Sequence, residues 1–275
     1  MSESVHYHLE KMVPELEEYV KTKIFSQDEV KNIVKKRTQM EYRISKNMAE
    51  KADFLKYIEY ELNLETLRKA RKERLGIKLK HDSPAEHSIV GHIYQIFDRA
   101  LRKFGGDVSL WLQYIECAKQ NNSSSILGRL FARAIQVHPM KPGFWIMAAS
   151  WEFEQNGNVG AARKLMQRAL RINPQAEKLW LEYFRLEWMF INLLKERRKV
   201  LGLKDQEQEG QIEIPQLEEE KESTFSLKSF DGIVPIIIYK NACSVLQSQS
   251  FHKNALEIAK QYEGSEKCQA LIIET

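Results

Sequence analysis

The chain has 275 residues, of which 43% are hydrophobic and 29% charged, and 42 basic against 38 acidic residues give a formal net charge of +4. This hydrophobic fraction excludes disorder along the whole chain and suffices for one long core or two compact ones. The near balance of charges excludes a globally basic nucleic-acid-binding protein, so any nucleic-acid surface has to be a local patch.

The N-terminal region, residues 1–86, is predicted to be helical. Apolar residues fall at helical spacing from Val5 to Glu50. Ser26 and Glu29 have the spacing of a capping box, which indicates that a helix begins there. The stretch "FLKYIEYELN" then predicts the first A-type helix of a repeat, because its aromatic residues lie on one helix face.

A repeat of 34 to 35 residues follows within residues 87–202. The words "LWLQYIECAK", "FWIMAASWEF" and "LWLEYFRLEW" each have a tryptophan in second place, at Trp111, Trp145 and Trp180 (145 − 111 = 34; 180 − 145 = 35). An arginine-alanine pair precedes each tryptophan by 12 residues, namely Arg99-Ala100, Arg133-Ala134 and Arg168-Ala169. Two markers that keep one phase over three units predict stacked two-helix units, an all-α solenoid.

Each unit is expected to pair an A helix, which carries the tryptophan, with a B helix, which carries the alanine. Gly105-Gly106, Pro139 and Pro174 are expected to end the three B helices. The tryptophans are interpreted as scaffold residues that cover the apolar face of one unit against the next, and the alanines as points of close helix approach.

A glutamate recurs seven residues after the first aromatic residue of three A helices, at Glu61, Glu152 and Glu187. A carboxylate repeated once per unit most often meets a neighbouring helix end or an arginine, so these three are expected to be structural.

The run at 66–81 is strongly basic, and it raises the question of RNA. Its candidate RNA-contact residues are Arg68, Lys69, Arg71, Lys72 and Arg74. Three interpretations stay open: a solvated face, a contact with RNA phosphates, or a contact with the chain's own acidic segment. Because Arg68, Arg71 and Lys72 share a helix face, replacing these three by glutamate is expected to weaken RNA binding without disturbing the fold.

The acidic stretch at 203–225 is expected to be a flexible linker. Residues 226–275 resume an apolar helical pattern, and a shorter helix is expected near 251–262. The array then stops abruptly, which suggests either a fragment or a short isoform.

No catalytic, cofactor-binding or metal-binding residues are predicted. The three cysteines have no disulfide or zinc spacing, and they favour a reducing compartment. The seven histidines are scattered and are expected at surface or capping positions. No phosphate-binding loop, signal peptide or membrane span is found, so we expect no enzyme, no small-molecule substrate and no membrane association.

Tetratricopeptide repeats have a glycine four positions after the tryptophan, where this chain has Ile115, Ala149 and Phe184. The pattern Trp-x-x-Tyr with glutamate, then Arg-Ala and proline, resembles instead the half-a-tetratricopeptide (HAT) repeat. That resemblance implies a right-handed, protein-binding solenoid of helix pairs in an RNA-processing assembly.

Several longer words resemble the U3 small nucleolar RNA-associated family of HAT-repeat proteins, among them "DFLKYIEYELNLETLRKARKERLG", "HSIVGHIYQIFDRA" and "KLWLEYFRLEWMF". Membership implies a non-catalytic scaffold subunit of the nucleolar small-subunit processome, needed for maturation of 18S ribosomal RNA. Its implied partners are WD-repeat and other processome proteins, with U3 small nucleolar RNA or ribosomal RNA precursor as a further contact. The alternative is a peptide-binding adaptor of another RNA-processing or chaperone complex.

Overall fold

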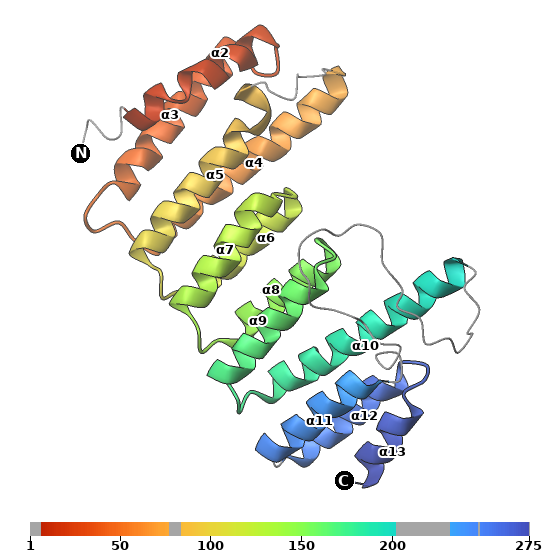
Figure 1. Ribbon diagram of the computed structural model, residues 1–275. Coiled ribbons are helices and arrows are strands. Elements are labelled where there is room, and N and C mark those ends of the chain that lie inside the picture. The colour runs from red at the N-terminus through yellow and green to blue at the C-terminus, as the bar shows by residue number, and fades with distance from the viewer. Residues whose placement is uncertain (1–6, 77–83, 202–231, 247, 275) are drawn as a thin grey trace. The chain divides into compact units, whose positions relative to one another are not determined.

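The computed structural model describes residues 7–76, 84–201, 232–246 and 248–274. In this part of the chain, all regular structure is helical and comprises twelve α-helices (Figure 1). The predicted all-α class is confirmed. The chain divides into two compact units, Met1–Leu130 and Phe131–Thr275.

The described residues of the first unit contain five complete helices from α2 onward. They are α2 (Val13–Lys21), α3 (Gln27–Ile44), α4 (Lys51–Leu75), α5 (Pro84–Lys103) and α6 (Val108–Gln120). Each helix packs on the next along the chain from α2 to α6, and α2 also packs on α5. Helix pairs that lie side by side and pack on the following pair form the arrangement of an α-solenoid.

Two helix ends in this unit show how the sequence sets the boundaries. The predicted capping box is present, because Ser26 N–H donates to the Glu29 carboxylate (2.9 Å) and Glu29 N–H donates to Ser26 Oγ (3.3 Å). Helix α4 ends at Leu75 because Gly76 takes a left-handed conformation with φ of 63°. The basic run therefore leaves the helix before residue 77, and its remainder lies outside the described residues.

Helix α7 (Ser124–Val137) spans the division between the units, and six helices follow it. They are α8 (Pro142–Glu154), α9 (Val159–Ile172), α10 (Glu177–Val200), α11 (Ile233–Val245), α12 (Gln249–Lys260) and α13 (Glu266–Glu274). In the second unit α8 packs on α9, α10 packs on both of them and on α11 and α12, and α12 packs on α13.

The predicted B helices stop at the predicted breakers. Helix α5 ends two residues before Gly105, and α7 and α9 end two residues before Pro139 and Pro174. After the acidic stretch at 203–225, which lies outside the described residues, α11 and α12 agree with the expected helices. Helix α13, in which Cys268 and Ile272 are buried, lies within the segment 226–275 that was expected to be helical, although no separate helix was predicted there.

Candidate functional site

Each repeat tryptophan is buried and also donates a hydrogen bond to the loop before its own helix. The indole Nε1 donors and their carbonyl acceptors are Trp111 to Gly105 (2.7 Å), Trp145 to Pro139 (2.9 Å) and Trp180 to Pro174 (2.9 Å). In all three the acceptor lies six residues before the tryptophan. The indole therefore fills the core and also ties the B–A loop to the A helix.

The side chain of Asn173 joins two successive loops. It is buried, and its Nδ2 donates to the Pro139 carbonyl at 2.9 Å, 34 residues earlier. The Pro139 carbonyl thus accepts from Trp145 and from Asn173. These bonds tie the loop before α8 to the loop before α10 within the second unit.

The alanine of each arginine-alanine pair is buried in every repeat, whereas the environment of the arginine varies. Ala100, Ala134 and Ala169 are fully buried. In contrast, Arg99 pairs with a buried glutamate, and Arg168 is exposed. The alanine therefore has the same packing role in each repeat, whereas the surroundings of the arginine differ between repeats.

Two of the recurring glutamates form buried ion pairs with an arginine 24 residues earlier. Arg37 on α3 donates from Nε and Nη2 to the two oxygens of Glu61 on α4 at 2.9 and 2.8 Å. Arg163 on α9 donates from Nε and Nη2 to Glu187 on α10 at 2.7 and 2.6 Å. The equal spacing shows that α3 and α4 are related like α9 and α10, so the repeat pattern reaches into the N-terminal region.

The two repeats that lie between these in the sequence lack one or both members of this arginine–glutamate pair. The equivalent positions are Tyr94 and Ala118 in one unit, and Gly128 and Glu152 in the next (118 − 94 = 24; 152 − 128 = 24). Without an arginine at that position, the half-buried Glu152 accepts a hydrogen bond from Asn156 at 2.9 Å. The pair is thus used where both partners occur together.

In the first unit the Arg37–Glu61 pair belongs to a larger buried cluster. Arg37 also donates from Nη1 to Glu15 on α2 at 2.5 Å. Nearby, Arg99 on α5 donates to both oxygens of Glu41 on α3 at 3.1 and 2.9 Å. These four charged residues and Glu61 join four helices through side chains that are largely removed from water.

The cluster holds the carboxylates of Glu41 and Glu61 in the charged form. Burial alone would raise the pKa of Glu41, but its interactions with His92 and Arg99 outweigh burial and lower the pKa to about 2. Burial also opposes ionisation of Glu61, and the adjacent Arg37 guanidinium nevertheless lowers the pKa of that carboxyl. Arg37, in turn, has a raised pKa because its two carboxylate partners outweigh its own burial.

Of the candidate RNA-contact residues on α4, three are at least partly buried and paired with acidic side chains, and two are exposed to solvent. Arg68 is buried and donates from Nε and Nη2 to Glu65 at 2.7 and 2.8 Å. Arg71 donates to both oxygens of Glu29 at 2.8 and 2.7 Å, and Lys72 Nζ donates to Glu86 at 2.5 Å.

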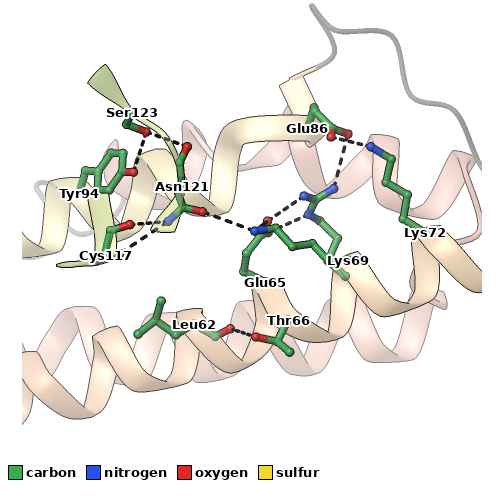
Figure 2. A network of polar contacts seen from close by, with 11 residues as sticks. Leu62, Glu65, Thr66, Lys69, Lys72, Glu86, Tyr94, Cys117, Asn121 and Ser123 are labelled. Atoms are coloured by element: carbon green, nitrogen blue, oxygen red, sulfur yellow. Dashed lines mark hydrogen bonds and ion pairs between the residues drawn. The ribbon is translucent and has the colours of Figure 1, made fainter. Parts of the chain in front are cut away.

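The shared face of Arg68, Arg71 and Lys72 is therefore turned toward the protein. The expectation that three glutamates there would leave the fold undisturbed is wrong, because they would reverse cations that are paired with acids. Figure 2 shows Lys72 directed at Glu86, and Lys69 directed at Glu65 and Asn121. Lys69 keeps 57% of its side chain exposed and Arg74 is exposed, so these two are accessible.

The expectation of surface or capping histidines is wrong for His92. Its side chain is 6% exposed and lies among Tyr57, Glu41 and Glu61. Among the described residues, no group of three or more metal-ligating side chains is assembled. None of the described helices has the length and apolar character needed to cross a bilayer.

Sequence reasoning found the tryptophans, the alanines and the glutamates, but it missed Arg37, Arg163 and His92. A search for charged residues at a fixed distance before the recurring glutamates would have found the two arginines. His92 gave no such signal, because the stretch "HSIVGHIYQ" contains no acidic residue and His92 acquires its carboxylate partners only through the fold.

The fold and its buried contacts place the chain in the class of helical-repeat proteins. In this class neighbouring repeats pack on one another, here through aromatic and ion-pair contacts. Residues 9–92 match the family described as U3 small nucleolar RNA-associated protein 6. The chain is 35% identical over 263 residues to a human protein named "U3 small nucleolar RNA-associated protein 6 homolog", covering 96% of this chain and 42% of the relative. It is 41% identical over 201 residues to the Schizosaccharomyces pombe protein named "U3 small nucleolar RNA-associated protein 6", covering 73% of this chain and 41% of the relative.

This family match and these relatives, similar over most of the chain, confirm the resemblance to U3 small nucleolar RNA-associated protein 6 that was expected from the sequence. The chain spans about two fifths of the length of these relatives. A shorter similarity, 33% over 63 residues, relates 23% of the chain to 9% of a Candida albicans protein named "Pre-mRNA-splicing factor CLF1".

Proposed function

We propose that the chain acts as a non-catalytic scaffold subunit of the nucleolar U3 small nucleolar ribonucleoprotein, within the small-subunit processome. In this role it supports maturation of 18S ribosomal RNA from its precursor. The observation that carries the proposal is sequence similarity to proteins of this name, which in the human relative extends over 96% of the chain.

The geometry supports a scaffold because the ionisable groups with the strongest interactions serve packing. Arg37, Glu61, Arg163 and Glu187 bond to one another between neighbouring helices. Groups held in this way fix the spacing of the helices. The function therefore lies in the outer surfaces that the stacked helices present.

The proposed partners are WD-repeat and other protein subunits of the processome, with U3 small nucleolar RNA or ribosomal RNA precursor as a secondary contact. A solenoid offers extended surfaces that suit several protein partners at once. The proposed location in the nucleolus follows from the same assignment.

Depletion of the chain from cells that contain it tests the proposal. We expect 18S ribosomal RNA to fall and its unprocessed precursor to accumulate, while the large-subunit ribosomal RNA stays at its normal level. A gene resistant to depletion should restore processing, and the same gene with Trp145→Ala should restore it poorly. Unchanged 18S ribosomal RNA after complete depletion would contradict the proposed role.

The proposed RNA contact requires a narrower test, made with the accessible cations only. Lys69→Glu combined with Arg74→Glu should weaken RNA binding equally for different sequences and lower the slope of log affinity against log salt by roughly 1.4 to 1.8, at about 0.7 to 0.9 per phosphate contact. The matched control is Lys56→Glu, earlier on the same helix. Equal binding by the double variant and the wild-type chain would remove α4 as an RNA contact.

A further inference from the structure

One buried ionisable group, His92, is not used in the proposed scaffold function. It lies on α5, and the two nitrogens of its ring face carboxylates from two other helices. Nδ1 is 3.5 Å from Glu61 Oε1 on α4, and Nε2 is 3.8 Å from Glu41 Oε1 on α3. Nε2 also lies 3.2 Å from the Tyr57 hydroxyl on α4.

The cluster around this ring is one positive charge short if His92 is neutral. Its carboxylates are Glu15, Glu41 and Glu61, and its guanidinium groups are Arg37 and Arg99, which leaves 3 − 2 = 1 negative charge. An uncompensated charge in a buried position is strongly unfavourable, and either protonation or a counter-charge removes it.

We propose that His92 is a buried imidazolium that completes the charge balance of this cluster, so that the first unit loses stability as the solution becomes alkaline. An imidazolium donates from both ring nitrogens, and both face acceptor oxygens. A neutral ring has only one N–H, so its other nitrogen would depend on the Tyr57 hydroxyl as donor, and the surplus negative charge would remain.

The other titratable groups near the His92 ring are consistent with a charged imidazolium. Besides the residues of the cluster, His8 before α2 and Lys11 are the nearby titratable groups toward the N-terminus, and burial followed by the charges of Arg99 and His92 lowers the pKa of His8. Burial by itself lowers the pKa of His92, but its interactions with the Glu41 and Glu61 carboxylates outweigh burial and raise the pKa above 6.5.

The sign of the pH effect follows from that direction. Below pH 6.5 the ring is protonated in the folded and unfolded states alike, and its full stabilising effect is present. Above pH 6.5 the unfolded chain loses the proton while the folded chain keeps it. The unfolding constant should therefore rise by as much as about tenfold per pH unit until the pKa of the folded state is reached.

Nuclear magnetic resonance of the full chain with isotope-labelled histidine tests the protonation state directly. His92→Gln identifies the His92 signal. At about pH 7 we expect the nitrogen shifts of an imidazolium for His92 and a titration midpoint above 6.5. Shifts of a neutral ring with its proton on Nδ1 at that pH would overturn the proposal.

Chemical unfolding between about pH 6 and 9 tests the consequence. The unfolding constant of the first unit should rise with pH in the wild-type chain, and His92→Gln should remove that rise. If His92→Gln does not fold, Glu41→Gln keeps the ring and removes one facing charge, which should move the His92 midpoint to lower pH. A midpoint that does not move, or a pH dependence that survives His92→Gln, would show that another group is responsible.

Discussion

At the scale of single residues, a repeat tryptophan combines two separable interactions. The ring of Trp145 is buried in the core of the second unit, and its Nε1 bonds to the Pro139 carbonyl at 2.9 Å. The same carbonyl also accepts from Asn173, so it stays bonded when the indole is lost. The ring and the hydrogen bond can therefore be removed one at a time.

Trp145→Phe should lower the free energy of unfolding by about 1 to 2 kcal/mol, because it removes one hydrogen bond and part of the ring. Trp145→Ala should cost about 3 to 5 kcal/mol, the usual loss for a buried large aromatic residue. Equilibrium unfolding in urea measures both. Trp151→Phe, at a half-buried tryptophan on the same helix, is the control and should cost less than about 1 kcal/mol. Equal losses for the phenylalanine and alanine variants would contradict the assignment.

The Arg163–Glu187 pair provides a second test at the residue scale. Arg163→Met leaves the Glu187 carboxylate, 1% exposed, without its cation, and should cost about 3 to 5 kcal/mol. Arg168→Met, five residues along the same helix at an exposed position, should change stability by less than about 0.5 kcal/mol. Urea unfolding again measures the two variants. Similar effects of the two substitutions would mean that the ion pair contributes little.

At the scale of helices, the cations of α4 show how the fold assigns different roles to neighbouring residues. Spacing correctly groups Arg68, Arg71 and Lys72 on one face, but it cannot say whether that face is turned to water. The partners that decide this, Glu29 and Glu86, come from α3 and α5. A charged run is thus easy to find in the sequence, whereas its orientation depends on contacts between distant segments.

A comparison within α4 follows from this difference. Arg68→Glu places a carboxylate against Glu65 and Glu86 in a buried position and should cost more than about 3 kcal/mol, enough to unfold part of the first unit. Arg74→Glu, at an exposed position near the end of the helix, should leave the fold intact. Circular dichroism and urea unfolding report both effects. A stable, fully helical Arg68→Glu variant would contradict the buried position of this arginine.

The Arg99–Glu41 contact between α5 and α3 predicts how the first unit responds to acid. The pKa of Glu41 is about 2 in the folded chain, against 4.5 without these partners, so its stabilising effect is complete above pH 4.5 and is lost as the pH falls toward 2. The difference corresponds to roughly 3 kcal/mol. Glu41→Gln should flatten this part of the stability profile, measured by urea unfolding at about pH 2 to 6. An equally steep profile in the variant would assign the acid response to other carboxyl groups.

At the scale of the whole molecule, local patterns predict most of the helical organisation. The B helices end where Gly105, Pro139 and Pro174 stop them, and the repeat phase alone is enough to locate the buried alanines. The N-terminal unit is harder to predict, because its first A-type helix has Phe54 in place of tryptophan. The Arg37–Glu61 pair relates this helix to the later units, and such a contact between helices has no signature within one helix.

We propose that the whole molecule is a scaffold held in the processome mainly by protein contacts. Affinity purification of the tagged full chain from cells, with and without ribonuclease treatment, tests this claim most directly. We predict that WD-repeat and other processome proteins co-purify in both conditions, and that U3 small nucleolar RNA co-purifies only without ribonuclease. Recovery of chaperones or splicing factors in place of processome proteins, or loss of every protein partner after ribonuclease, would contradict the claim.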